Sequence, residues 1–115
     1  MQRQFRLTRS DDFKRVRRSG KSYAHPLVVL IAQASEAHHL HVGVAAGTTV
    51  GNAVHRNRAK RLLREAMRPM LPRLAPGWDL VLIARPPIVA ASLEQVGSAL
   101  TSVLGRAGLI SSNDA

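Results

Sequence analysis

Cysteine is absent from the 115 residues of the chain, and its absence excludes several kinds of chemistry. A chain without thiols has no disulfide framework, no thiolate zinc site, no iron–sulfur cluster and no cysteine nucleophile. The longest apolar run, Leu27 to Ala32, is far shorter than the roughly 20 residues that span a bilayer. Met1–Phe13 also lacks the apolar stretch of a secretory signal. We therefore expect a cytoplasmic protein with no membrane partner.

Acidic side chains are few, and their scatter argues against a nuclease site in the chain itself. A nuclease of the two-metal type needs several carboxylates that converge on the ions, whereas the seven Asp and Glu residues are spread along the sequence. The spacing of the five histidines indicates no pair of general acid and base. Phosphate-binding loops and nucleophile elbows are missing too. We therefore expect no catalytic residue and no metal site in this chain.

Positive charge is what the sequence has in excess. The formal net charge is +10 and the sequence pI is about 11.8. Residues 1–21 carry a net +6 and residues 51–68 a net +5, while the remainder carries −1. An excess confined to two segments is typical of a surface that binds a polyanion. A DNA-binding protein would need a helix-turn-helix pair, which the sequence does not show, so we expect RNA and not DNA as the partner.

The chain length and an apolar content of 45% fit one RNA-binding domain over residues 1–110, with a disordered tail at 111–115. Hydrophobic periodicity predicts three helices and three strands in the order α-β-β-α-β-α. Their predicted ranges are Thr8–Arg18, Leu27–Ala32, Leu40–Ala46, Asn52–Arg68, Trp78–Ala84 and Ser92–Ala107. We expect an α/β fold of the two-layer α+β kind, with helices on a small, mostly antiparallel sheet. The first two strands are expected to form an antiparallel hairpin.

Capping signals precede all three predicted helices. Thr8 with Asp11 and Ser92 with Gln95 have the spacing of capping boxes. Asn52 is suited to cap the middle helix. The apolar stripe predicted for the last helix consists of Leu93, Val96, Leu100, Val103, Leu104 and Ala107.

The middle helix carries the most specific signal. At 100° per residue its apolar side chains fall within one arc, which contains Ala59, Leu62, Leu63, Ala66 and Met67. A ridge of cations with a spacing of four residues consists of Arg56, Lys60, Arg64 and Arg68. Asn57 and Arg61 lie beside this ridge, and Arg58 lies at the border of the apolar arc. The helix is therefore expected to dock by one side and to offer the other to phosphates, which arginine binds with two hydrogen bonds.

The segment Val50–Glu65, with the sequence VGNAVHRNRAKRLLRE, resembles the RNR signature of the protein subunit of bacterial ribonuclease P. Similarity at Arg6–Val16 and at Asp79–Pro86 extends the resemblance from about Arg6 to Leu109. The family fold that the resemblance implies is an α/β sandwich with a left-handed β-α-β crossover, and this crossover contains the RNR helix.

The resemblance also implies a function. In that family the large RNA subunit is the catalyst, uses bound Mg²⁺, and removes the 5′ leader of precursor tRNA by hydrolysis of a phosphodiester. The protein binds this RNA, contacts the leader, and strengthens the binding of substrate and metal ions. We expect one protein per RNA subunit.

The resemblance assigns RNA contacts to Arg56, Asn57, Arg58, Lys60, Arg61 and Arg64, and the spacing of the ridge adds Arg68. It implies a leader cleft between the first helix and the sheet, in which Phe13 matches a family aromatic. We include Arg9, Arg17 and Ile31 in this cleft, although the family often has aromatics at the last two positions. Aromatic residues make up only 3% of the chain, so we infer that leader binding depends more on arginine and phosphate than on stacking.

Several interpretations remain open at the level of sequence. Phe13 suits packing in the core and lining of a cleft equally well. His38, His39 and His41 are better explained as solvated hairpin residues than as metal ligands. A ribosomal or other RNA-structural protein with no role in cleavage is the alternative function.

Overall fold

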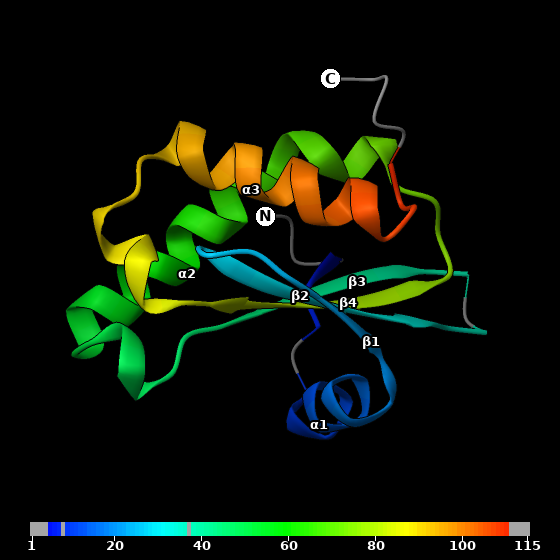
Figure 1. Ribbon diagram of the computed structural model, residues 1–115. Helices are drawn as coiled ribbons and strands as arrows, with labels where there is room; N and C mark the ends of the chain where they lie inside the picture. The colour runs from blue at the N-terminus through cyan, green and yellow to red at the C-terminus, as the bar shows by residue number, and fades with distance from the viewer. Residues whose placement is uncertain (1–4, 8, 37, 111–115) are drawn as a thin grey trace.

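The computed structural model describes residues 5–7, 9–36 and 38–110 (Figure 1). The predicted cap Thr8 and the predicted tail 111–115 lie outside these residues. The regular elements are α1 Ser10–Ser19, β1 Lys21–Ala24, β2 Val28–Ala34, β3 Leu40–Ala45, α2 Ala53–Met67, β4 Trp78–Ala84 and α3 Leu93–Arg106. They are joined by the 3₁₀ helices η2 Thr48–Val50, η3 Arg68–Arg73 and η4 Pro86–Ala90.

The four strands form one mixed sheet in the order β1-β2-β4-β3. The β1–β2 and β2–β4 pairs are antiparallel, and the β3–β4 pair is parallel. The predicted hairpin of Leu27–Ala32 with Leu40–Ala46 is therefore wrong, because β4 lies between these two strands. This strand is apolar and almost wholly buried, and such a strand is typical of the interior of a sheet. The predicted element order also lacked β1, a short edge strand whose residues are mostly exposed.

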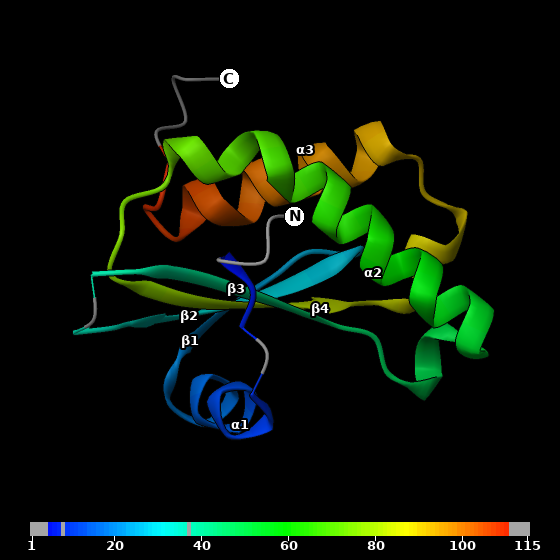
Figure 2. The same ribbon diagram turned by 180° about the vertical axis from the view of Figure 1, so that it is seen from behind.

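The unit β3-α2-β4 forms a left-handed crossover, as the family resemblance implied. Both strands run from right to left in Figure 1, with β3 behind β4 and α2 above the sheet. Figure 2, which shows the same molecule from behind, places β3 in front. From the left end of β3 the chain returns to the right through α2, above the sheet, and then enters β4 on the viewer's side of β3. The path is therefore clockwise as it moves toward the viewer, which is the left-handed sense. Crossovers of this hand are rare.

Helices cover both faces of the sheet (Figures 1 and 2). The large core lies between the sheet and the pair α2 and α3, and includes Leu30, Leu63, Leu82 and Leu100. The opposite face carries α1 over a small cluster of buried side chains, which consists of Leu7, Val16, Ile31 and Val81. Since α1 has only ten residues, it is too short to be stable in isolation. Its position therefore depends on its contacts with the sheet.

Local signals correctly placed two of the three helix starts. Asn52 caps α2 by accepting a hydrogen bond from the backbone N–H of His55 at 3.0 Å. Ser92 and Gln95 form the predicted capping box of α3. The position before α1 is Arg9, which makes no side-chain capping bond. Leu93 is 49% exposed instead of buried, because it is the first residue of α3 and lies ahead of Val96, where the buried stripe begins.

Replacing Gly20 by alanine is expected to lower the free energy of unfolding by about 1–3 kcal/mol. Gly20 ends α1, and a Cβ there would lie 2.6 Å from the carbonyl oxygen of Val16 and 2.7 Å from Cγ2 of Ile31. The backbone of the α1–β1 turn must therefore shift. Urea unfolding measures the effect. Gly97→Ala in α3 is the control, because an added Cβ there would meet no atom within 4 Å other than the nearby backbone of its own helix, and alanine favours a helix. Equal losses for the two variants would contradict the prediction.

Candidate RNA interface

The α2 helix is amphipathic in the way that the sequence predicted. Ala59, Leu63, Ala66 and Met67 are buried against the core. Among the cationic and amide residues, Asn57, Arg61 and Arg68 are exposed, and Arg56, Lys60 and Arg64 are half-buried. One side of the helix thus holds it on the sheet, and the other presents a strip of positive charge.

This strip forms one wall of an open groove of about 590 Å³. The groove is lined by Arg6, Asn57, Lys60, Arg61, Arg64, Glu65 and Arg68. Arg6 comes from the other basic segment of the sequence, and a single parallel bridge pairs it with Val42 on β3. The fold therefore places Arg6 of the first basic segment on the same surface as the cations of the second. Six of the seven lining residues are basic or amide side chains, which is the chemistry that a phosphate backbone binds.

The positive charge in this groove is least compensated at Arg64. Its Nε atom is buried and has no hydrogen-bond partner among the described residues. Burial and, after it, the positive charge of Arg6 lower the pKa of the Arg64 guanidinium below its usual value. Because the two side chains repel each other, an anion between or beside them would stabilise the folded chain.

The thermal midpoint is accordingly expected to rise by roughly 5 °C in sulfate relative to chloride at equal ionic strength. Matched ionic strength separates anion binding from general screening. Arg6→Gln removes one of the two like charges, so this variant should melt higher than wild type without sulfate and respond less to its addition. Equal midpoints in the two salts would rule out the repulsion.

Arg58 differs from its neighbours on the RNR helix. Its Nη1 donates a hydrogen bond of 3.0 Å to the carbonyl oxygen of Val89 in η4. Arg58 therefore links α2 to the segment that follows β4, and part of its effect is structural. Arg68 pairs with Glu65 at 3.0 Å on the exposed side. Arg61 is exposed in the groove, so we expect its substitution to disturb the fold little.

The residues expected in the leader cleft lie on or near α1. Arg9 and Arg17 are exposed, whereas Ile31 is 6% exposed and lies in the small cluster beneath the helix. Phe13 is half-buried, and its ring lies directly against Gly43, where a Cβ would be 2.4 Å from Cζ. The ring also lines a smaller opening of about 240 Å³ between Arg6, Arg64 and β3. Phe13 is thus packed against the sheet on one side and exposed in this opening on the other.

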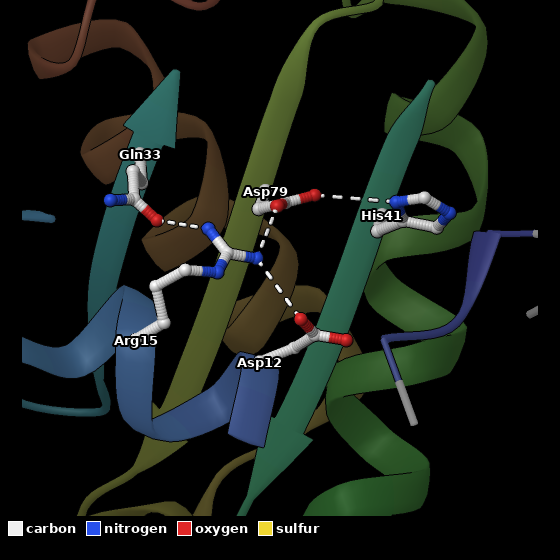
Figure 3. A network of polar contacts seen from close by, with 5 residues as sticks. All are labelled: Asp12, Arg15, Gln33, His41 and Asp79. Atoms are coloured by element: carbon white, nitrogen blue, oxygen red, sulfur yellow. Dashed lines mark hydrogen bonds and ion pairs between the residues drawn. The ribbon is translucent and has the colours of Figure 1, made fainter. Parts of the chain in front are cut away.

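A polar network that the sequence did not predict joins α1 to three strands (Figure 3). Arg15 donates to Oδ2 of Asp79 at 2.8 Å and to Oδ1 of Asp12 at 3.3 Å, and it also hydrogen-bonds Gln33. The Asp79 hydrogen bond is the main cause of a raised Arg15 pKa. His41 Nδ1 lies 3.3 Å from Oδ1 of Asp79. His41 is therefore not the solvated hairpin residue expected, because its strand pairs with β4.

No candidate metal centre emerges from the described part of the chain. Within residues 5–7, 9–36 and 38–110, no three His, Asp or Glu side chains are close enough together to hold a metal ion. In the same ranges no helix combines the length and apolarity that a transmembrane segment requires. Asp79 is the one buried charged residue among those described, and it is satisfied by Arg15.

Comparison with known proteins identifies the family. Residues 1–108 match the family model described as Ribonuclease P. The chain belongs to the ribonuclease P protein family. The ribonuclease P protein component of Herpetosiphon aurantiacus is 39% identical over 109 residues, which are 95% of this chain and 89% of that protein. The corresponding protein of Exiguobacterium is 38% identical and covers 93% of each chain.

Solved structures of the ribonuclease P family share the fold. The ribonuclease P protein of Staphylococcus aureus superposes with a TM-score of 0.82 at 29% identity, covering 92% of this chain and 97% of the other. The protein of Thermotoga maritima gives a TM-score of 0.77 at 26% identity, covering 88% and 96%. The mixed sheet with three helices is therefore the family fold, and the resemblance inferred from the RNR signature is confirmed.

Proposed function

We propose that this chain is the protein subunit of ribonuclease P and binds the catalytic RNA through the groove beside α2. The observation that carries the proposal is the convergence of Arg6 with the cations of α2 on one surface. The strip from Arg56 to Arg68 extends about 18 Å along the helix. A strip of this length follows several phosphates, and each contact releases condensed counterions.

The chemistry of cleavage is assigned to the RNA partner. The described residues offer neither converging carboxylates nor a metal-binding cluster, and the sequence indicates no pair of general acid and base. The proposed reaction is the hydrolysis that removes the 5′ leader of precursor tRNA, with Mg²⁺ held mainly by the RNA. The chain contributes positive charge and a rigid binding surface, and we propose one protein per RNA subunit in the cytoplasm.

The face of the sheet that carries α1 is proposed to contact the leader. Phe13 supplies one partly exposed ring, and Arg9 and Arg17 are exposed on the same helix or at its start. Since cations outnumber rings here, phosphate contacts are expected to dominate the affinity, which then falls steeply with NaCl.

The proposal is tested with a complex reconstituted from this chain and the ribonuclease P RNA. Its affinity for precursor tRNA is measured with and without a leader at several NaCl concentrations. A ribonuclease P subunit should raise the affinity for the substrate that carries the leader, with a steep salt slope and a small loss for Phe13→Ala. A shallow slope with a large loss for Phe13→Ala would contradict the phosphate-dominated mode. Binding to structured RNA with no effect on precursor tRNA would favour the alternative, an RNA-structural protein.

A further inference from the structure

Three cross-strand rows of side chains make up the face of the sheet that carries α1. Strand pairing aligns Gln33, Asp79 and His41 in the first row. The second row consists of Ser22, Ile31, Val81 and Gly43, and the third of Ala24, Val29, Ile83 and Ala45. The first row is polar and the other two are apolar or small. Successive rows are two residues apart along each strand, or roughly 7 Å.

The α1 helix crosses the strands and lies over the second row. Its Val16 is fully buried in the cluster with Ile31 and Val81, and Phe13 lies against Gly43. Figure 1 shows α1 nearly end-on beneath strands that run across the view. The α1 helix leaves the third row partly exposed to solvent, because Val29, Ile83 and Ala45 are each half-buried.

Burial of apolar area alone does not select the second row over the third, although Phe13 fits the second row because Gly43 has no side chain there and the third row has Ala45. Both rows are apolar or small, and the hydrophobic effect is non-directional, so a shift of α1 toward the third row would bury the partly exposed Val29 and Ile83. A polar contact opposes such a shift as well. Arg15 extends from α1 to the first row, where it binds the buried carboxylate of Asp79 at 2.8 Å and the side chain of Gln33.

We propose that Asp79 is a positioning residue that holds α1 over the second row, and thereby keeps the third row open for an extended single strand of RNA. Asp79 is 4% exposed, so it acts through Arg15 and not by touching RNA. His41 and Asp12 complete the contacts of the carboxylate and the guanidinium (Figure 3). The identity of the bound strand as the tRNA leader rests on the proposed function.

A distance measurement tests the position of α1 directly. The natural sequence has no cysteine, so Lys14→Cys on α1 and Thr48→Cys in η2 accept two spin labels without background. Both residues are exposed, and η2 follows the end of β3 that carries the third row. In the full chain, Asp79→Asn and Arg15→Met should shorten or broaden the distance, by up to the row spacing of roughly 7 Å. An unchanged distribution in both variants would overturn the proposal.

A binding measurement on the reconstituted complex tests the consequence for RNA. Asp79→Asn is expected to lower the leader-dependent gain in affinity for precursor tRNA about tenfold, with the affinity for the RNA subunit changed less than twofold. Arg15→Lys should retain most of the leader-dependent gain, because a lysine keeps the ion pair with Asp79. Arg18→Met, on the exposed side of the same helix, is the matched control.

The outcomes separate the positioning role from the proposed function. Parallel losses in leader affinity and RNA-subunit affinity would show a general folding role for Asp79 and overturn the inference. If wild type itself showed no leader-dependent gain, the proposed function would fail, whereas the spin-label distance would still report whether Asp79 positions α1.

Discussion

Replacing Leu63 by alanine is expected to lower the free energy of unfolding by about 2–5 kcal/mol. Leu63 is fully buried in the core between α2 and the sheet. The loss combines the transfer free energy of the removed methyl groups with the cost of the cavity left behind. A domain of this size has a total stability of only about 5–15 kcal/mol, so the variant would lose a large part of it.

Urea unfolding checks this prediction through the midpoint, with the m-value unchanged if the transition stays two-state. Val54→Ala is the matched control, because Val54 is on the same helix and 73% exposed. This surface change should alter stability by no more than about 0.5 kcal/mol. A cost for Leu63→Ala below about 1 kcal/mol would mean that this core does not hold α2 on the sheet.

Replacing Arg61 by alanine is expected to weaken RNA binding about tenfold and to leave stability nearly unchanged. The side chain is exposed in the groove that also contains Arg6, so its removal takes away a phosphate-binding charge and creates no cavity. The dependence of log affinity on log salt should also become shallower, by about 0.7–0.9 for the removal of a single phosphate-binding charge.

Titration of the RNA subunit at several NaCl concentrations measures both effects. Arg106→Ala removes the same unit of charge from the far end of α3, where Arg106 is exposed and hydrogen-bonds the carbonyl of Ala24. This control should lose much less affinity. Equal losses for the two variants would indicate attraction to overall charge, and a large melting shift for Arg61→Ala would indicate a structural role.

Features that depend on neighbouring residues were predictable from the sequence. The bounds predicted for the third strand, Trp78–Ala84, are those of β4, because turn residues bracket a continuous apolar run. The α2 helix begins after the predicted cap Asn52, since the capping bond reaches only three residues along the chain. The cationic side of this helix follows from periodicity alone.

Features that depend on distant residues were not predictable in the same way. The parallel pairing of β3 with β4 joins segments more than 30 positions apart, whereas the hairpin rule considers only adjacent strands. Arg6 reaches the groove beside α2 through a bridge to Val42. Asp79 at the start of an apolar strand looks like a boundary residue, and only the register shows that it faces Arg15 and His41.

Cleavage of precursor tRNA at low Mg²⁺ is the most direct test of the claim that this chain supplies a binding surface to a catalytic RNA. The reaction is compared for the chain alone, the ribonuclease P RNA alone, and the two together. We expect no product with the chain alone, little with the RNA alone, and efficient removal of the 5′ leader with both. Product formed by the purified chain without RNA, or no gain when the chain joins the RNA, would contradict it.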